Sequence, residues 1–460
     1  MKGRGLWSSQ WPFYLATIGS SFGLGNLWRF PYVVGENGGG AFVLLYLCCA
    51  LFLGLPILIA ELTLGKAKRR GLLSIVDSVV RANPEIRPSA TARVLKWAAR
   101  LSIAACLLAL SYYAVISGWV LHFAARYAVS VFTEDLSVAQ DSLRVLIKNE
   151  GLQVALTLGH LMLTVFIVAK GVREGLERWT LVVVPIFLVL GFVLMVQALR
   201  LPSAEQAIRF LLYPDFSKLT PFSLGQALGH VLFTASLGFG MMVSFGSYLP
   251  EGVHIPTLGF RVIVMDTLAS VFAAILIFSI VFGAGVSSGG GPWLLFETLP
   301  LLLARVGWGP LWGLFFFLCL YLAALGASIG LLQAAVSNLM DRYNYRRDRA
   351  TLAIGGLVLA LSVFPALSSN ALRDFRIFGL PGLVFADTLL IAWLLPLAAL
   401  VPAYFIFSGL SEERRRAEYI HESYPTSAQT YAMWGIAVRW LFPLAIATAL
   451  SVWVIGSIKS

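Results

Sequence analysis

The stretch from Gly19 to Pro31 constrains this chain most, because it places polar and helix-breaking residues inside a hydrophobic span. It reads Gly-Ser-Ser-Phe-Gly-Leu-Gly-Asn-Leu-Trp-Arg-Phe-Pro, where a lipid-facing helix would carry leucine. In hydrocarbon, a broken helix is tolerated only where protein or a polar cavity replaces the lost backbone hydrogen bonds. Small residues four apart also suit close helix packing, but packing does not require Asn26 or Arg29, which are costly in lipid. We therefore predict a binding site at this break.

The overall composition is that of a polytopic membrane protein. Hydrophobic residues account for 58% of the 460 residues and charged residues for only 12%, which a water-soluble domain of this length does not show. The chain has a net charge of +11, with Lys and Arg clusters at 66–70, 346–349 and 414–416 on one side of the predicted spans. This is the positive-inside pattern, so we expect no nucleic-acid partner. It predicts an inner (cytoplasmic) membrane location, a cytoplasmic N-terminus and an external C-terminus.

Segments of about twenty apolar residues, the length that crosses a bilayer, predict about eleven transmembrane helices. Their edges are 11–33, 41–65, 97–125, 151–171, 177–200, 224–249, 258–285, 308–338, 350–367, 381–408 and 432–457. All four cysteines fall inside these segments without metal-ligand spacing, and we expect them to be buried core residues.

The sixth span carries a second break. Residues 233–240, Phe-Thr-Ala-Ser-Leu-Gly-Phe-Gly, place hydroxyl groups and two glycines at mid-membrane, five spans after the first break. Interrupted helices at corresponding positions of two halves are typical of inverted-repeat secondary transporters. Half-helix N-termini can hold an anionic group and unwound carbonyls can hold a cation. The pattern therefore predicts a small substrate with a carboxylate, accompanied by a monovalent cation.

Several motifs resemble the neurotransmitter:sodium symporter family, in its bacterial amino-acid branch with the leucine-transporter (LeuT) fold. They are Gly23 to Pro31, Glu36 to Phe42, Pro56 with Glu61, Tyr112-Tyr113, Gly171 to Arg178, and Ser236 to Gly240. The resemblance implies an all-α fold with a 5+5 inverted repeat and broken helices 1 and 6. It also implies a single transporter domain over 1–460, with the first repeat at 11–200, the second at 224–408 and an extra span at 432–457.

The resemblance also implies a substrate site. In this family Tyr113 would bind the substrate carboxylate, and the carbonyls of the two breaks would bind its ammonium group. Gly23 stands where monoamine carriers have an aspartate, which favours an amino acid that brings its own carboxylate. The implied lining residues are Ser20, Ser21, Leu24, Gly25, Ala109, Tyr113, Phe233, Thr234, Ser236, Phe239, Ala327 and Leu331.

The implied first sodium site uses the Ser21 carbonyl, the Asn26 and Thr234 side chains, the substrate carboxylate, and residue 266. Oxygen ligands suit a hard cation. The family commonly has asparagine at the last position, whereas this chain has Asp266. A fixed negative charge there would replace the chloride of animal relatives, so we expect chloride independence, although the chloride-site matches Tyr46 and Ser270 are present. The alternative for Asp266 is an ordinary helix-end aspartate.

The implied second sodium site departs from the family. Only the carbonyls of Gly19, Phe22 and Ala323 remain, because Gly326 and Ala327 replace the two hydroxyl residues of the eighth span. We expect this site to be weak or lost, unless a register shift of one residue allows Ser328 to contribute.

The resemblance implies two gates. Arg29 is expected to pair with Asp387 on the outer side, with Asp374 as the alternative partner, because ionisable residues within a membrane are usually paired. Arg4, Trp7, Tyr248 and Asp341 match the cytoplasmic gate. His230 stands where relatives have glutamine. It is either a hydrogen-bonding replacement or a proton relay.

We therefore expect a sodium-coupled symporter, working by alternating access, for a neutral and apolar L-amino acid. A proton-coupled carrier of the same fold, using Asp266 or His230, is the alternative within transport. A membrane receptor that binds an amino acid without transporting it is the alternative from another class. No catalytic motif supports an enzyme.

Overall fold

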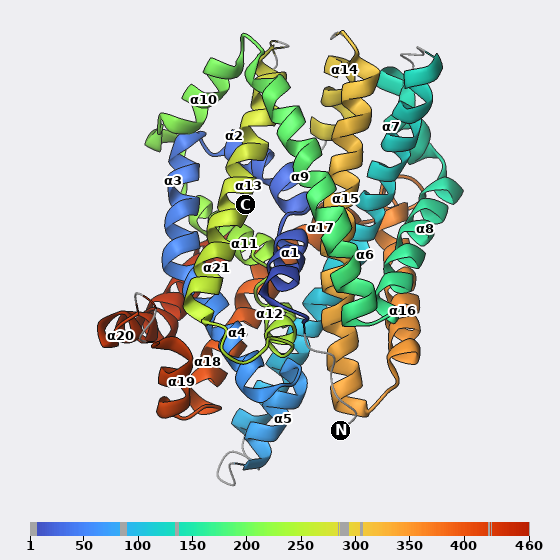
Figure 1. Cartoon of the computed structure of the whole chain (residues 1–460). Coiled ribbons are helices and arrows are strands. Elements are labelled where there is room, and N and C mark those ends of the chain that lie inside the picture. The colour runs from blue at the N-terminus through green and yellow to red at the C-terminus, as the bar shows by residue number, and fades with distance from the viewer. Residues whose placement is uncertain are drawn as a thin grey trace.

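Two helices of the bundle are interrupted where the sequence predicted breaks (Figure 1). The computed structural model describes residues 7–82, 90–133, 138–283, 285, 294–303, 307–421, 424 and 426–459. The first interrupted helix runs as α1 (Gln10–Ser21), a π-helical segment (Gly25–Arg29) and α2 (Phe30–Glu36). The second runs as α11 (Pro221–Thr234) and α12 (Met241–Gly246).

The other elements of the described residues are almost all helices. They are α3 (Gly40–Cys49), α4 (Leu55–Lys68), α5 (Leu72–Ala82), α6 (Ala90–Thr133), α7 (Val138–Lys148), α8 (Glu150–Ala169), α9 (Arg178–Leu199), α10 (Ala204–Leu212), α13 (Ile255–Gly283), α14 (Leu299–Leu303), α15 (Gly309–Tyr343), α16 (Arg347–Leu367), α17 (Gly382–Thr388), α18 (Leu395–Ser408), α19 (Glu412–Tyr419), α20 (Ala428–Ile436) and α21 (Phe442–Lys459). Short helical segments of other pitch lie at Ala50–Gly54, Val172–Glu177, Phe216–Lys218, Leu294–Thr298, Leu389–Leu394 and Ala437–Leu441. Strands β1 (Arg376–Ile377) and β2 (Leu380–Pro381) pair antiparallel.

Nine helices in the described residues are long and apolar enough to cross a membrane. They are Gly40–Lys68, Ala92–Thr133, Glu150–Ala169, Val172–Leu199, Ile255–Gly283, Gly309–Tyr343, Arg347–Leu367, Gly382–Ser408 and Ala428–Ile455. They correspond to nine of the eleven predicted spans. The other two are the interrupted helices, whose pieces are each too short to cross alone. The prediction of an all-helical membrane protein is therefore confirmed.

Several helices extend beyond the predicted spans. The third span, predicted at 97–125, belongs to α6, which continues in both directions. The apolar pattern locates only the part that must lie in lipid, whereas a helix can continue into water. The polar connections at 66–96 and 410–431 contain the short helices α5 and α19 at the lower end of the bundle (Figure 1). The resemblance also implies an outer loop at 292–306, of which residues 292–293 and 304–306 lie outside the described residues.

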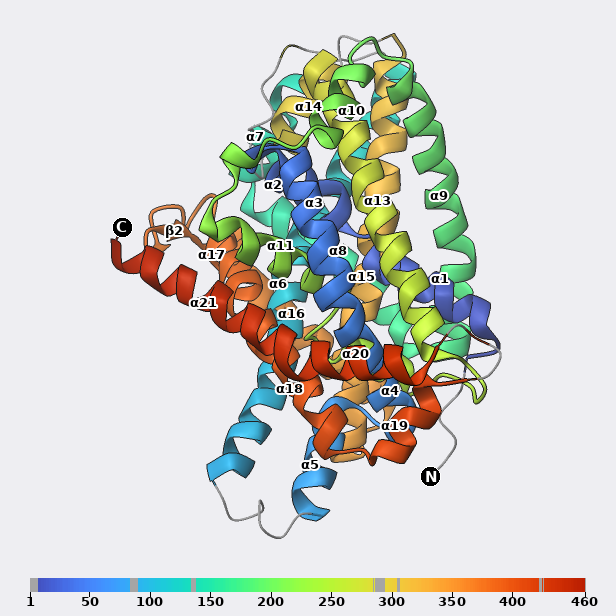
Figure 2. The ribbon, with the colours of Figure 1, turned by 90° about the vertical axis from the view of Figure 1, so that its left-hand side faces the viewer.

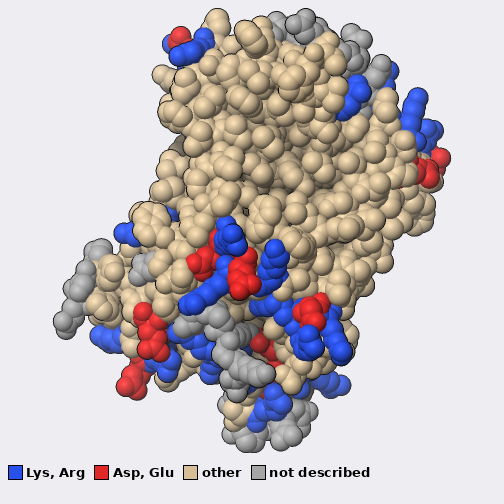
Figure 3. Space-filling view, turned by 45° about the vertical axis from the view of Figure 1, so that its right-hand side comes forward, with Lys and Arg blue, Asp and Glu red and all other residues tan. Residues whose placement is uncertain are grey.

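The charged surface agrees with a membrane orientation along the long axis of the bundle. On the face in Figure 3, the upper part of the surface is largely free of charged side chains apart from a few near its edges, and most charged side chains lie from mid-height downward, toward the end that carries α5 and α19. Figure 2 shows that α21 lies obliquely across the outside of the bundle. The prediction of buried cysteines is wrong for Cys48, which is exposed, while Cys49, Cys106 and Cys319 are buried. Cys48 and Cys49 are successive helical residues and face different directions.

Close backbone contact holds α12 against α4. A Cβ atom added to Gly65 of α4 would overlap the carbonyl oxygen of Val243 in α12, so only glycine fits at this contact. Glu61, one turn earlier on α4, accepts a 2.8 Å hydrogen bond from the Gly238 amide in the second break. The helix α4 therefore supports the break both by packing and by its carboxylate.

We predict that Gly65→Ala destabilises the protein by about 1 to 3 kcal/mol, the usual cost of overpacking a dense contact. The measurement is thermal unfolding of the purified protein in detergent. Gly159→Ala in α8 is the matched control, because a Cβ there meets no atom within 4 Å. Equal unfolding temperatures for the two variants would contradict this account of the α4 and α12 contact.

Candidate substrate and ion site

The two breaks enclose a cavity near the middle of the bundle. Its lining comes from the first break, from α6, from the second break and from α15, and consists of Ser21, Gly23, Gly25, Tyr113, Phe233, Thr234, Ser236, Phe239, Ala327 and Leu331. Nine of the twelve residues predicted to line a substrate site are among them. Of the other three, Leu24 and Ala109 are fully buried, and the side chain of Ser20 is outside the described part of the chain. Gly23 is a lining residue that the prediction omitted.

The first break exposes backbone groups to this cavity. The helix α1 ends at Ser21, and Phe22 leaves helical geometry with a ψ of 81°. The Leu24 amide donates a 2.8 Å hydrogen bond to the hydroxyl of Tyr113 on α6. A Cβ at Gly23 would overlap that hydroxyl, so glycine is needed for Tyr113 to reach the break. Tyr113 is thereby positioned with its hydroxyl at the start of a helix, where a carboxylate is favoured.

The second break depends on left-handed backbone geometry. Ser236, Gly238 and Gly240 all have positive φ angles, of 58°, 81° and 68°. Glycine adopts this geometry without steric cost, whereas serine does so only under strain. Ser236 therefore stands in a strained conformation at the cavity wall. Strain of this kind is often found where a site is built for a ligand.

Asp266 forms a buried polar cluster beside the cavity. Its carboxylate accepts a hydrogen bond from Asn26 Nδ2 at 2.8 Å and lies 2.8 Å from the Thr234 hydroxyl. The Tyr46 hydroxyl donates to the same carboxylate at 3.2 Å. The Ser270 hydroxyl lies 2.8 Å from Asn26 Nδ2. Asn26, Thr234 and Asp266, predicted from three different helices to hold sodium, are thus brought together.

The donor set of this cluster fits a monovalent cation. Asp266 is only 4% exposed, and no Lys or Arg in the described residues forms an ion pair with it. A buried carboxylate without a counter-charge is costly. The groups around it are neutral: the hydroxyl groups carry oxygen atoms, the ligands that hard cations prefer, whereas Asn26 turns Nδ2 toward Asp266 and its Oδ1 toward the Gly23 amide. Asp266 is therefore a buried carboxylate without a cationic side chain beside it in the described residues.

The region of the second predicted sodium site is closely packed. A Cβ at Gly326 would overlap the carbonyl oxygen of Gly19, so α15 lies directly against α1 here. The Ser328 hydroxyl is bound instead to His160 Nε2 on α8, at 2.9 Å. Ser328 is thus engaged with α8. The carbonyls of Gly19, Phe22 and Ala323 have no neighbouring side-chain hydroxyl from residues 326 and 327.

Above the cavity, Arg29 reaches Asp387 of α17. Arg29 Nε lies 3.6 Å from Asp387 Oδ2, and the Tyr112 hydroxyl donates to Asp387 Oδ1 at 3.1 Å. The alternative partner, Asp374, is highly exposed and pairs with its neighbour Arg373. The structure therefore places Arg29 with Asp387, the partner that the sequence analysis expected.

His230 is part of the same cluster. Its Nδ1 lies 3.2 Å from Arg29 Nη1. Because a guanidinium can only donate, Nδ1 must be the acceptor, and the ring is neutral with its proton on Nε2. The rings of Phe30 and Tyr46 pack around it. The geometry is that of a hydrogen-bond acceptor that orients Arg29.

Below the cavity, Tyr248 contacts both α15 and the segment that precedes α1. Its hydroxyl lies 3.2 Å from Ser337 of α15, and its carbonyl accepts from the Trp7 amide at 3.2 Å. Trp7 is buried against Phe13 and Phe245. Asp341 accepts a 2.6 Å hydrogen bond from the Gly71 amide. Arg4, the fourth predicted member of this gate, lies outside the described residues.

Sequence reasoning missed three residues that support these sites. The Tyr112 hydroxyl donates a hydrogen bond to Asp387. Gly326 packs against the Gly19 carbonyl in the region of the second predicted sodium site. Glu177 accepts hydrogen bonds from the Ser8 amide and hydroxyl. The only indication of the role of Tyr112 in the sequence was its position beside Tyr113. The other two depend on contacts between distant segments.

An all-helical membrane bundle with two interrupted helices around an enclosed cavity is the architecture of a secondary transporter. The chain belongs to the sodium:neurotransmitter symporter family, whose sequence profile matches residues 4–148 and 142–378. The resemblance inferred from the motifs is therefore confirmed.

Individual relatives support the same assignment. The chain is 34% identical to an uncharacterized sodium-dependent transporter of Bacillus subtilis (strain 168), YhdH, over 96% of this chain and 95% of the relative. It is 29% identical to an uncharacterized sodium-dependent transporter of Haemophilus influenzae, over 97% of each. The crystal structure of MhsT in complex with L-phenylalanine matches with a TM-score of 0.86 and 32% identity, covering 97% of this chain and all of that one. These relatives are transporters, and the LeuT fold is confirmed.

We predict that Tyr113→Phe weakens amino-acid binding roughly 5- to 150-fold, because it removes the partner of the buried Leu24 amide and a donor to the substrate carboxylate. Equilibrium binding to the purified protein measures this. Tyr127→Phe on the same helix is the control, because the buried Tyr127 hydroxyl makes no hydrogen bond in the described residues. Unchanged affinity of the Tyr113 variant would exclude its role.

Proposed function

We propose that the chain is a sodium-coupled symporter that imports a neutral, apolar L-amino acid by alternating access, without a need for chloride. The observation that carries the proposal is the cavity between two broken helices with the Asp266 cluster beside it. A substrate carboxylate at Tyr113 would lie next to the proposed sodium ligands. Binding of the ion and the amino acid would then be coupled through direct contact.

The cavity walls support the substrate class. Four apolar side chains line the cavity, those of Phe233, Phe239, Ala327 and Leu331. Apolar walls favour an apolar side chain. Gly23 brings no carboxylate to pair with an amine, so the substrate supplies its own. MhsT, a structural relative, was crystallised with L-phenylalanine, which makes this amino acid the first to test.

The proposed first sodium site uses the Ser21 carbonyl, the side chains of Asn26, Thr234 and Asp266, and the substrate carboxylate. When bound, sodium would supply the positive charge that the buried Asp266 carboxylate lacks. Asp266 would in turn supply the negative charge that a bound chloride ion provides in animal relatives. We propose that the second site is lost, because Gly326 approaches the Gly19 carbonyl and Ser328 is bound to His160.

Alternating access would use the two gates in turn. We propose that Arg29 with Asp387 closes the outer side, and that Tyr248, Trp7, Asp341 and Arg4 close the inner side. Spans 1, 2, 6 and 7 would rock against spans 3, 4, 8 and 9. We further propose one domain over 1–460 with repeats at 11–200 and 224–408, and a cytoplasmic end that carries α5 and α19. In this proposal the protein lies in the inner membrane, and its N-terminus lies in the cytoplasm.

Binding of labelled amino acids at varied sodium concentration, with constant ionic strength and at two pH values, tests the proposal. We expect L-phenylalanine or another apolar amino acid to bind with a sodium Hill coefficient near one. A coefficient near two would contradict the loss of the second site. Binding that depends on pH and not on sodium would overturn the sodium assignment in favour of a proton carried by Asp266.

We predict that Asp266→Asn lowers the apparent sodium affinity in chloride-free medium, because the ion loses a formal negative charge. Chloride should then restore part of the binding, since Tyr46 and Ser270 remain to hold an anion. Asp374→Asn, an exposed aspartate paired with Arg373, is the control and should behave like the unmodified protein. Uptake by the Asp266 variant that matches the unmodified protein in both media would contradict the proposed role.

A further inference from the structure

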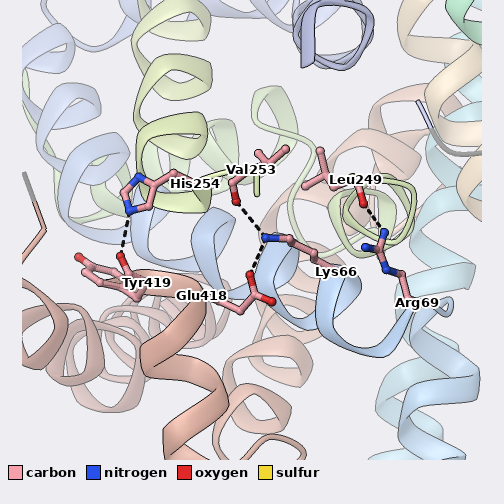
Figure 4. Close-up of polar contacts among 7 residues, drawn as sticks. All are labelled: Lys66, Arg69, Leu249, Val253, His254, Glu418 and Tyr419. Atoms are coloured by element: carbon pink, nitrogen blue, oxygen red, sulfur yellow. Dashed lines mark hydrogen bonds and ion pairs between the residues drawn. The ribbon is translucent and has the colours of Figure 1, made fainter. Parts of the chain in front are cut away.

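Three segments that are far apart in the sequence meet at the end of the bundle that carries α19. Figure 4 shows the C-terminal turn of α4 between the loop that follows α12 and the helix α19. Lys66 lies in the last turn of α4 and Arg69 directly follows this helix, Leu249 and Val253 lie in the loop, and Glu418 lies in α19. This loop contains Tyr248, the tyrosine that contacts Ser337 below the cavity.

Arg69 holds the chain immediately after α12. Its guanidinium donates hydrogen bonds to the carbonyl oxygens of Ser247 and Leu249, on either side of Tyr248. Both carbonyls lie just beyond the end of α12 at Gly246, where the backbone no longer forms regular helical hydrogen bonds and needs other partners. A cation at this position both satisfies them and fixes the backbone that carries Tyr248.

Lys66 holds the next part of the loop. Its ammonium group donates to the Val253 carbonyl at 2.9 Å and to Glu418 Oε2 at 2.6 Å. The two charged side chains are only 9% and 16% exposed. A pair that is this well shielded from water interacts more strongly than a surface pair, and removing one partner leaves the other charge uncompensated.

A second contact joins the same loop to α19. His254 Nε2 lies 3.0 Å from the Tyr419 carbonyl oxygen and Nδ1 lies 2.8 Å from the Thr257 hydroxyl. The Tyr424 ring stacks on the imidazole at a centroid distance of 4.2 Å. Burial lowers the pKa of His254, which favours the neutral ring. The loop is therefore attached to α19 at two successive residues, Val253 through Lys66 and His254 directly.

The helix α19 is itself anchored to the scaffold. Arg415 donates hydrogen bonds to the carbonyl oxygens of Ile406, Phe407 and Leu410 at the end of α18. The loop after α12 is thus tied, through Lys66 and Glu418, to the end of the tenth span.

We propose that Lys66 and Glu418 are positioning residues for the inner gate. Glu418 fixes the Lys66 ammonium, Lys66 and Arg69 fix the loop on both sides of Tyr248, and Tyr248 thereby stays in contact with Ser337. Loss of the pair frees the loop, so the inner side opens more readily. The gating role of these residues rests on the proposed transport function, whereas their contacts can be tested without substrate.

A double-mutant cycle tests the proposal. The variants are Lys66→Gln, Glu418→Gln and the double variant, in the full-length purified protein without substrate. The readout is hydrogen exchange of the amides in residues 244–254, which reports local opening. We expect each single variant to exchange on the order of fivefold faster, and the double variant to match the singles, because the residues act as one unit.

The matched control is Glu413→Gln, an exposed glutamate on the same helix, which should leave exchange of residues 244–254 unchanged. Lys66→Arg keeps the charge and the donors, and should retain most of the protection, which separates loss of the pair from general unfolding. Unchanged exchange in Glu418→Gln, or effects of the two single variants that simply add, would overturn the proposal. Failure of sodium-dependent binding in the unmodified protein would overturn the proposed function and leave this result intact.

Discussion

The need to satisfy every backbone amide inside a membrane is the constraint on which the structure depends. Two helices are opened at their centres, and several of the freed backbone amides donate to side chains, from the same interrupted helix or from a neighbouring one. Tyr113 accepts from the Leu24 amide, Asn26 from the Gly23 amide, and Glu61 from the Gly238 amide. Without these side chains the open segments would be unstable in lipid, and uninterrupted helices would have the lower free energy.

The same constraint applies to charge. Asp266 and Arg29 are both buried near the middle of the bundle, and each is surrounded by groups selected for its sign. Arg29 has a carboxylate and the lone pair of His230 as acceptors. Asp266 has donors but no cationic side chain among the described residues. One charge is therefore balanced within the protein, whereas the other has no counter-charge from a side chain, and this difference is the reason for the proposal that a small cation binds there.

The contacts on the two sides of the cavity differ in kind, and the terms outer and inner follow the proposed orientation. The outer side depends on an ion pair and an imidazole, which are polar contacts between three helices. The inner side depends on a buried tryptophan, a tyrosine hydroxyl and a backbone loop held by cations from α4. Because the loop after α12 is linked to α19 through Lys66 and Glu418, the proposed inner gate would involve the connection between the last two spans.

The sequence by itself determined the spans and the two breaks, and its resemblance to a known family implied most of the cavity lining. Bilayer thickness sets the length of an apolar segment, and glycine, serine and asparagine in such a segment are tolerated only at a protected break. The partner of Arg29 was also predictable, because few carboxylates lie within spans. Only the tertiary structure decided that Ser328 turns toward His160, that Cys48 faces outward, and that Lys66 meets Glu418. Neighbouring residues on a helix point about 100° apart, so the rotation of each helix and its packing partners, which composition does not encode, decide what a given side chain contacts.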